Sequence, residues 1–329
     1  MNRTFTRIVV FSLICLAVAG CKKKDKMSYH PVGTINNVAI KDIVGVDSDM
    51  LLVLGSEKNK SVVYSFGIEN RSSEKRLSKN IEYNDICFDN GTTWLCGNDM
   101  NIRVSNDTAR SVDEDKIPDF SYWDEWPTEK SNMVEMYVKD GKPRYAIGKR
   151  DMLKGNFYLY NNDEYFFHGN TQVDLGLNDM VVVNDTVYIA GYGSILRVTN
   201  NGADINYEEI GDENFTSIAV GNGKYLYAST YSGKIYRSKI GSNEWEKINH
   251  SGKHLLFVEA NDFGDVVAMG ESREVLVSTD FGNTWREEKY DEGNKVSCLV
   301  SIDNVFYVGT EKGTIIKMTK ESLDLNVED

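Results

Sequence analysis

The sequence predicts an all-β fold, and two recurring features support this prediction. Residues typical of β-hairpin turns recur along the chain, and a short apolar run follows each of them and usually ends in glycine. The composition agrees, because 329 residues include 18 Tyr, 13 Phe and 27 Gly but only 4 Pro, as expected for strands joined by tight turns. A chain of this length can bury a large core.

A unit of about 43 residues repeats from residue 38 onward, within the range of four-stranded repeat units. Each unit begins with a strand and a polar turn, continues with an apolar strand, and closes with a third and a fourth strand. The turns between first and second strands have hairpin chemistry. They are Asp47-Ser48-Asp49, Asn90-Gly91, Asp140-Gly141, Asn184-Asp185, Asn222-Gly223, Gly264-Asp265 and Asp303-Asn304, which makes seven units.

The later strands of the unit are recognisable too. Glycine ends the second strand in six units, and Ser229 takes this place in the seventh. Apolar and polar residues alternate in the third strands, which are clear at 102–105, 195–198, 234–238 and 314–317. The sequence therefore predicts a seven-bladed β-propeller of four-stranded antiparallel blades, with a β-sandwich or an eight-bladed ring as alternatives.

Such a ring must close, because an open sheet edge promotes aggregation. Residues 29–35 could supply a strand to the last blade beside residues 322–327, and the sequence leaves open which end of the chain does so.

Residues 1–20 are predicted to be a lipoprotein signal peptide. Arg3 and Arg7 precede an apolar run that is too short to span a bilayer. The run ends in Val18-Ala19-Gly20-Cys21, which resembles a bacterial lipobox. The resemblance implies cleavage before Cys21 and lipidation of that residue; a plain secretory signal is the alternative.

The domain prediction follows from this segment. Residues 21–37 form a lipidated tether, with a strand that could close the ring, and residues 38–329 form a single propeller domain. The mature chain is expected to be held at the bacterial envelope by its lipid, and Lys22 in place of an aspartate favours the outer membrane over the inner one. The net charge of −13 would repel phosphate backbones and argues against a nucleic-acid partner.

The most specific motif is the turn Ser278-Thr279-Asp280-Phe281-Gly282-Asn283-Thr284-Trp285. Ser278 and Asp280 can hydrogen-bond nearby backbone groups, and Gly282 can adopt a positive φ. The eight residues resemble the Asp-box of the BNR repeat families, which are β-propellers such as sialidases, sortilin-type receptors and photosystem II assembly factors. The resemblance implies a bracing role for Ser278, Asp280, Gly282, Thr284 and Trp285 between the third and fourth strands.

Two similar stretches are interpreted differently. Residues 89–94 match the core of the motif but lie at the first turn of their unit, so the match is a coincidence. Residues 238–245 lie at the place of the motif in the preceding unit and keep only Ser238, Asn243 and Trp245, so they are a degenerate copy.

The cysteines leave one question open. Cys87 and Cys96 flank the turn Asn90-Gly91, and they could form a disulfide if the hairpin register placed them opposite each other, whereas a small change of register forbids it. Cys298 lies alone in an apolar run and is expected to pack as a small hydrophobic residue.

Catalytic, metal and cofactor motifs are missing from the sequence. The arginine and tyrosine pattern of a sialidase is not found, and no zinc or phosphate-binding motif occurs. His250 and His254 are separated by a predicted loop, which argues against a shared metal. We therefore expect no catalytic residue, no metal and no cofactor.

A partner-binding site is expected on the face formed by connections between blades and by the loops after second strands. Aromatic and arginine side chains suit a sugar or a protein there. The candidate residues are Tyr122, Trp123, Trp126, Arg150, Tyr192, Tyr231 and Arg273. A purely structural role for Trp123 and Trp126 under the loop remains the alternative.

The sequence thus favours a membrane-anchored envelope propeller that is a non-enzymatic module for binding a protein or a glycan. The alternative is a carbohydrate-active enzyme, a glycoside hydrolase or lyase, with its site on the central channel. A structural envelope component is a third reading. The sequence does not identify the ligand or the oligomeric state.

Overall fold

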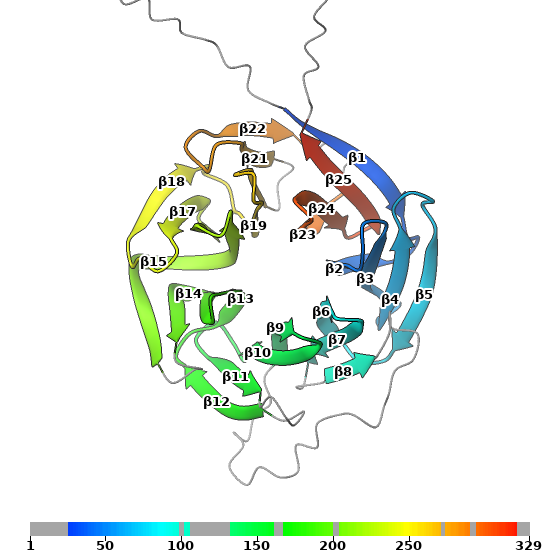
Figure 1. Cartoon of the computed structure of the whole chain (residues 1–329), viewed down its shortest axis with the longest axis horizontal. Helices are drawn as coiled ribbons and strands as arrows, with labels where there is room; N and C mark the ends of the chain where they lie inside the picture. Colours follow the sequence, from blue (N-terminus) through cyan, green and yellow to red (C-terminus); the bar gives the residue numbers. More distant parts are fainter. Residues whose placement is uncertain are drawn as a thin grey trace, which may run out of the picture.

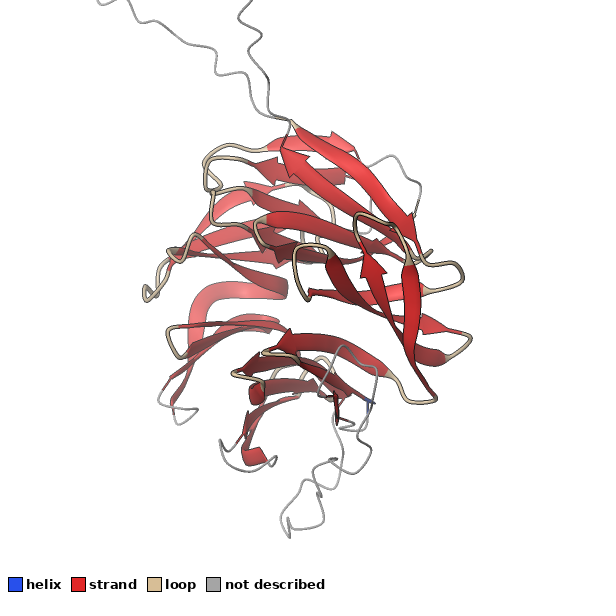
Figure 2. Ribbon diagram, turned by 45° about the vertical axis from the view of Figure 1, so that its right-hand side comes forward, coloured by secondary structure: helices blue, strands red, loops and turns tan. Residues whose placement is uncertain are grey.

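The computed structural model describes residues 26–98, 102–105, 132–160, 167–199, 204–270, 274–289 and 294–320. These residues form 25 β-strands, and every pair of neighbouring strands is antiparallel. The sheets stand around a central axis (Figure 1), and strands joined by short loops make up the described chain (Figure 2). The predicted all-β propeller is confirmed.

Four sheets have four strands each, as predicted for a blade. The first contains β2 (Ala39–Gly45), β3 (Met50–Glu57), β4 (Lys60–Gly67) and β5 (Ser73–Lys79). The second contains β9 (Asn132–Lys139), β10 (Lys142–Lys149), β11 (Gly155–Tyr160) and β12 (Phe167–Val173). The third contains β19 (Phe257–Ala260), β20 (Val266–Met269), β21 (Glu274–Ser278) and β22 (Arg286–Lys289). The fourth contains β23 (Val296–Ile302), β24 (Val305–Thr310), β25 (Thr314–Lys320) and β1 (Met27–Thr34).

The other two sheets differ from the predicted form. One has three described strands, β6 (Tyr83–Asp89), β7 (Thr92–Gly97) and β8 (Ile102–Ser105). The other has six, β13 (Leu177–Val183), β14 (Thr186–Thr199), β15 (Asp204–Gly221), β16 (Tyr225–Thr230), β17 (Lys234–Lys239) and β18 (Trp245–His250).

The predicted count of seven four-stranded blades is therefore wrong, since the described residues contain four. One reason is β15, which is 18 residues long. Its first part pairs with β14 and its second part with β16, so two repeat units share one sheet. The other reason is that residues 106–131, where a fourth strand beside β8 was expected, lie outside the described residues.

The seven predicted hairpins are all present as antiparallel pairs of the first and second strands. In five of them both turn residues have positive φ, as a two-residue type I′ turn requires. These turns are Asn90-Gly91, Asp140-Gly141, Asn184-Asp185, Asn222-Gly223 and Asp303-Asn304. The predicted third strands are also found, within β8, β14, β17 and β25.

The N-terminal strand closes the ring. β1 pairs with β25 from Met27 opposite Lys320 to Thr34 opposite Thr314. This answers the question that the sequence left open for residues 29–35. Residues 322–327 lie outside the described residues.

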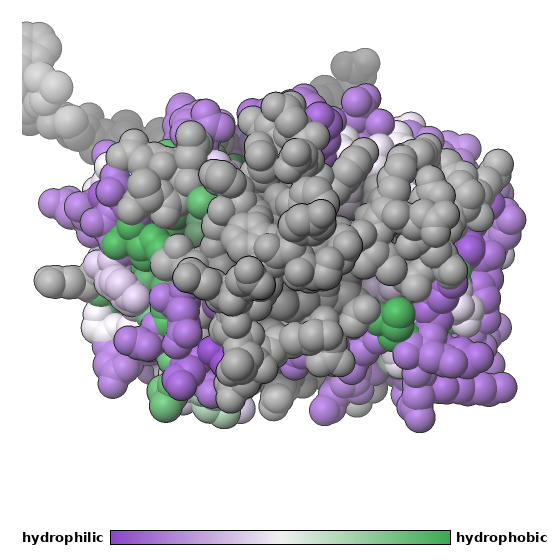
Figure 3. All heavy atoms as spheres, turned by 90° about the horizontal axis from the view of Figure 1, so that it is seen from below, coloured by the Kyte–Doolittle hydropathy of each residue, from purple (hydrophilic) through white to green (hydrophobic). Residues whose placement is uncertain are grey.

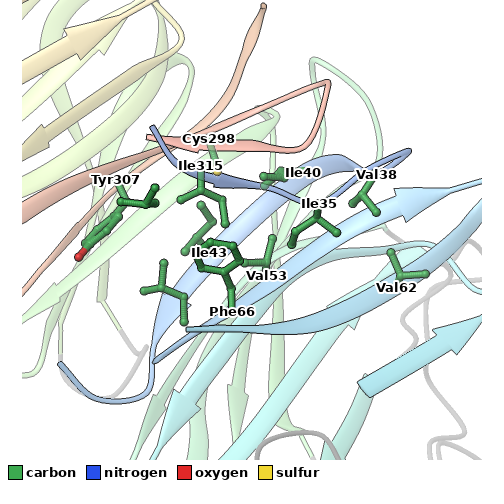
Figure 4. Packing of buried hydrophobic residues seen from close by; sticks show 12 residues of the cluster. Ile35, Val38, Ile40, Ile43, Val53, Val62, Phe66, Cys298, Tyr307 and Ile315 are labelled. Carbon is green, nitrogen blue, oxygen red and sulfur yellow. The ribbon is translucent and has the colours of Figure 1, made fainter. Parts of the chain in front are cut away.

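The core lies between neighbouring sheets. Figure 4 shows one such layer, in which Val53 and Phe66 pack against Ile315 and Cys298 from the last sheet. Cys298 is buried there, as expected. No helix in the described residues has the length and apolar character needed to cross a membrane.

The glycines at the ends of second strands have a steric cause. A Cβ at Gly97 would lie 2.0 Å from the carbonyl oxygen of Glu82, and one at Gly270 would lie 1.8 Å from that of His254. In these two units the chain that enters the inner strand passes so close to the end of the second strand that a side chain does not fit.

Cys87 and Cys96 do not form a disulfide. The two-residue turn places Cys87 opposite Trp94 and Cys96 opposite Asp85. Both thiols instead face the Asp85 carboxylate, at 3.4 Å from Cys87 and 3.7 Å from Cys96.

Candidate binding face

The two faces of the ring carry different connections. On one face the first hairpin turns meet the turns between third and fourth strands, since the Phe281 N–H donates to the carbonyl of Gly264 at 2.8 Å. On the other face the loops after second strands meet the entries into inner strands, since the Ser251 N–H donates to the carbonyl of Gly233 at 2.9 Å. We call this second side the loop face. It includes residues 150–154, 174–176, 191–193, 230–233 and 251–256.

The turn between β10 and β11 presents two aliphatic side chains on the loop face. The N–H groups of Arg150 and Asp151 donate to the carbonyl of Lys154 at 3.0 and 3.3 Å, and the Leu153 N–H donates to the Asp151 carboxylate at 2.7 Å. These bonds fix the backbone of the turn. Met152 is 59% exposed and Leu153 is 68% exposed.

Backbone hydrogen bonds connect this turn to Tyr192. The Gly176 N–H donates to the carbonyl of Met152 at 2.9 Å, and the Tyr192 N–H donates to the carbonyl of Gly176 at 2.8 Å. A Cβ at position 176 would lie 2.5 Å from the Asp151 carbonyl oxygen, so this close approach requires glycine. Tyr192 is 39% exposed and lies opposite Asn214 of β15.

Asn214 in turn connects Tyr192 to Tyr231. The Tyr231 N–H donates to the carbonyl of Asn214 at 2.9 Å. The rings of Tyr231 and His254 are stacked, with centroids 4.0 Å apart and planes 10° apart. The His254 Nδ1 donates to the carbonyl of Tyr231 at 2.6 Å. Both rings are exposed, so they form a small aromatic surface at the entry to β19.

The loop that carries Tyr231 is held by Glu213. This carboxylate accepts a hydrogen bond from the Ser232 hydroxyl at 2.7 Å and forms an ion pair with Lys234. Burial raises the Glu213 pKa, but the hydrogen bonds from Lys234 and Ser232 outweigh burial and hold that pKa below its usual value. The loop is therefore fixed at neutral pH.

We call the exposed residues that these backbone hydrogen bonds place on the loop face the apolar arc; they are Met152, Leu153, Tyr192, Tyr231 and His254. Six large hydrophobic side chains are prominently exposed in the described residues, and four of them belong to the arc. Phe263 lies in a turn on the opposite face, and Tyr207 lies in β15. Seen from the side of the ring in Figure 3, the described surface is mostly hydrophilic, with hydrophobic atoms in small separate areas. Contiguous apolar surface marks interaction sites.

Three of the residues predicted for partner binding lie on the loop face as described. Tyr192 and Tyr231 belong to the apolar arc, and Arg150 lies beside it, with its Nη1 donating to Gln172 Oε1 at 3.4 Å. The predicted residues Tyr122, Trp123, Trp126 and Arg273, and the predicted lipidation site Cys21, lie outside the described residues. Their roles stay predictions.

Met152, Leu153 and His254 were not among the binding residues predicted from the sequence. Aliphatic residues in a chain usually indicate core, and nothing in the sequence alone shows that this pair is turned outward. Their position directly after a second strand, between Asp151 and Lys154, was the available signal. The stack of His254 on Tyr231 joins residues 23 positions apart and could not be read from the sequence.

The turn with the most specific motif lies on the opposite face, between β21 and β22. Asp280 accepts hydrogen bonds from the N–H and the hydroxyl of Thr284, both at 2.8 Å, and from the Ser278 hydroxyl at 2.9 Å. The Trp285 indole donates to the carbonyl of Gly282 at 3.0 Å. Burial raises the Asp280 pKa, but these hydrogen bonds outweigh it and lower that pKa below its usual value.

The inner strands stand around the axis of the ring (Figure 1). Residues of these strands line a second candidate site, a cavity of about 230 Å³. Five carboxyl groups line it, each from a different inner strand, and we call them the channel carboxyls. They are Asp42, Asp85, Glu135, Asp179 and Glu259. Burial is the main cause that raises the pKa of each of the five.

The channel does not have the arrangement of a metal site. Within the described ranges, no three His, Cys, Asp or Glu side chains are placed to hold a metal ion. The nearby cations are engaged elsewhere, since Lys41 donates to Glu82 at 2.8 Å and Lys149 donates to Asn178 at 2.7 Å.

Comparison with known proteins supports the fold. No protein-family model matches the chain, and no curated protein is a significant match. Several solved structures are similar. The WD40 β-propeller domain of Doa1 has 14% identity and a TM-score of 0.68, over 90% of this chain and 98% of that one. Virginiamycin B lyase from Staphylococcus aureus has 13% identity and a TM-score of 0.70, over 90% of this chain and 99% of the lyase chain.

A third similar structure is YCF48 from Cyanidioschyzon merolae, with 13% identity and a TM-score of 0.68, over 88% of this chain and 98% of that one. YCF48 has also been solved bound to a D1 peptide. At these identities the likeness concerns the fold alone. The shared fold includes both binding proteins and a lyase, so it does not decide the activity of this chain.

Proposed function

We propose that this chain is an envelope-anchored β-propeller that acts as a non-enzymatic binding module, and that a partner protein binds the apolar arc of the loop face. The observation that carries the proposal is the arc itself. Its side chains are exposed on one face of the ring and presented by turns that backbone hydrogen bonds fix. A rigid apolar surface loses little conformational entropy on binding, which is typical of interaction hot spots.

The composition of the arc favours a protein over a glycan. Sugars stack on aromatic rings, and Tyr192 and Tyr231 could serve either kind of partner. Met152 and Leu153, however, are neighbouring aliphatic side chains that are 59% and 68% exposed. Aliphatic side chains offer a sugar no ring to stack on, whereas they pack well against apolar side chains of a polypeptide.

The anchoring part of the proposal rests on the first 21 residues. The resemblance to a lipobox supports a lipid on Cys21 and a place at the envelope, with the outer membrane favoured. The resemblance to the BNR families rests on the eight residues 278–285 and supports a bracing role for that turn rather than an activity.

The alternative, a carbohydrate-active enzyme with its site on the central channel, has weaker support. Such an enzyme needs carboxyl groups that can reach a substrate. Four of the five channel carboxyls instead accept a backbone N–H from a neighbouring strand, namely Asp42, Asp85, Glu135 and Asp179.

The proposal can be tested with a form of the protein that starts at Lys22, immobilised and exposed to envelope extract. A double variant, Met152→Ser with Leu153→Ser, removes the aliphatic part of the arc. Phe263→Ser is the matched control, because Phe263 is 70% exposed on the opposite face. We expect the unmodified protein and the control to retain the same polypeptide, and the double variant to lose it.

Treatment of the extract with protease separates the two kinds of ligand. Retention that survives protease and does not depend on Met152 and Leu153 would contradict the proposal and favour a glycan. Cleavage of envelope glycans by the unmodified protein would favour the enzyme.

A further inference from the structure

The channel carboxyls are placed at the junctions between neighbouring inner strands. The Ile86 N–H donates to Asp42 at 3.0 Å and the Met136 N–H to Asp85 at 2.7 Å. The Met180 N–H donates to Glu135 at 2.5 Å and the Ile218 N–H to Asp179 at 2.8 Å. In each case the acceptor is on one inner strand and the donor is on the next, so these carboxyls join the strands around the ring.

A fifth junction uses a hydroxyl in the same way. The Val258 N–H donates to the Ser217 hydroxyl at 3.3 Å. Ser217 opposes Ser229 directly after a register shift in β15, and Asp179 opposes Ala190 directly after one in β13. Asp179 in β13 and Ser217 in β15 therefore occupy equivalent positions. The carboxyl group of Asp179 titrates, whereas the hydroxyl of Ser217 does not.

Two pairs of channel carboxyls are neighbours in space, because Asp42 accepts the N–H of Ile86, the residue after Asp85, and Glu135 accepts the N–H of Met180, the residue after Asp179. Two carboxyl groups can share a hydrogen bond only when one of them carries a proton. If both were ionised, two like charges at this distance would repel each other, and burial would strengthen the repulsion.

The groups that face these pairs do not supply a compensating cation. Asp85 faces the thiols of Cys87 and Cys96, and Cys298 lies near Asp42. Glu259 lies near Asp179 and adds a further carboxyl group, not a cation. Lys41 is the one lysine among the described residues that line the cavity, and it bonds to Glu82 instead. Lys149 bonds to Asn178.

We infer that the two carboxyl pairs are proton-dependent clasps: each holds one proton between neighbouring inner strands, and loss of that proton as the pH rises loosens the β2–β6 and β9–β13 junctions. The ring is thereby a conformational device that responds to pH. Its inner strands are held together most firmly in mildly acidic solution and are released in alkaline solution.

Burial and pairing of the carboxyls determine whether the folded ring gains or loses stability as the pH rises. Both causes raise the pKa of Asp42 and of Glu135 well above the usual value. A carboxyl whose pKa is raised by folding contributes stability that is complete below its unfolded pKa, near 4, and is lost as the pH rises through the folded pKa. The melting temperature should therefore fall as the solution is made more alkaline.

The first test is the melting temperature from pH 5 to pH 9, for the unmodified protein, Glu135→Gln and the exposed control Glu311→Gln. The glutamine at 135 can still accept the Met180 N–H, and its amide donates permanently to Asp179. We expect Glu135→Gln to melt more than about 3 °C higher at pH 9 and to depend less on pH. The control should follow the unmodified protein. A melting temperature that is unchanged or rises between pH 5 and pH 9 would overturn the inference.

The second test needs no variant. Amide hydrogen exchange, corrected for its intrinsic dependence on pH, should show that protection of Ile86 and Met180 falls at alkaline pH. Ile35 is the internal control, because its N–H donates to the backbone carbonyl of Gly313 at 2.8 Å and no channel carboxyl takes part in this bond. Equal loss of protection at all three amides, or no loss at any of them, would contradict a clasp that depends on these protons.

Discussion

At the scale of single residues, Asp280 shows how a short motif fixes one turn. Its two carboxylate oxygens accept hydrogen bonds from Ser278 and from both donors of Thr284. The degenerate copy has Ile240 in the place of Asp280 and Ser242 in the place of Gly282. The indole N–H of Trp245 is buried there without a hydrogen-bond partner in the described structure, unlike that of Trp285.

We predict that Asp280→Ala destabilises the protein by about 1–3 kcal/mol, because the donors of Thr284 and Ser278 lose their acceptor. Urea unfolding at pH 7 measures this difference, with Asp262→Ala as a control at an exposed turn on the same face. Folding lowers the Asp280 pKa. The contribution of Asp280 to the free energy of unfolding is therefore present above the pKa of this group in the unfolded chain, and it is lost as the pH falls through its pKa in the folded protein. The difference between variant and parent should therefore shrink below about pH 4; a constant difference down to pH 2 would contradict the account.

Residues also show the limit of what the sequence could predict. Asp42, Asp85, Glu135 and Asp179 are spaced like the repeat, but many other acidic residues surround them in the sequence. Only the register shift near the start of each inner strand turns these four toward the channel. Such a shift depends on contacts between strands and has no signature of its own in the sequence.

At the scale of elements, hairpins were predictable because Asn-Gly and Asp-Gly pairs favour positive φ at two successive positions. The sheet that two repeat units share through β15 could not be predicted from the sequence. Residues 206–213 contain four acidic side chains and one glycine, which indicate a loop between units. In the structure β15 continues through them, with Gly211 at a φ of 98°, and passes from β14 to β16.

β1 is expected to stabilise the closed ring. It pairs along β25 and buries Met27 and Val32 against the last sheets. Burying two such side chains contributes about 3–6 kcal/mol. A chain that starts at Ile35 should therefore melt about 5–10 °C lower than one that starts at Lys26. Differential scanning calorimetry measures the change, and equal melting temperatures would show that β1 is not needed to close the ring.

At the scale of the whole molecule, the ring separates three tasks. One face carries the braced turns, the centre carries the channel carboxyls, and the loop face carries the apolar arc. The repeats in the sequence predicted the ring and the face on which binding residues should gather. They did not predict which side chains stand out on that face, because exposure is decided by the neighbouring loops. Tyr192 and Tyr231 were predicted as binding residues from their position after second strands, whereas Met152 and Leu153 were not predicted; the binding role of all four is a proposal.

The central claim, that a partner protein binds the apolar arc, is tested most directly by photo-crosslinking in intact cells. A photoreactive amino acid replaces Leu153 in one variant and Phe263, on the opposite face, in the other. The account predicts that the variant with the photoreactive residue at position 153 gives one dominant protein adduct. The variant at position 263 should give no adduct of the same mass. An adduct of equal yield at Phe263, or the absence of any adduct at Leu153, would contradict it.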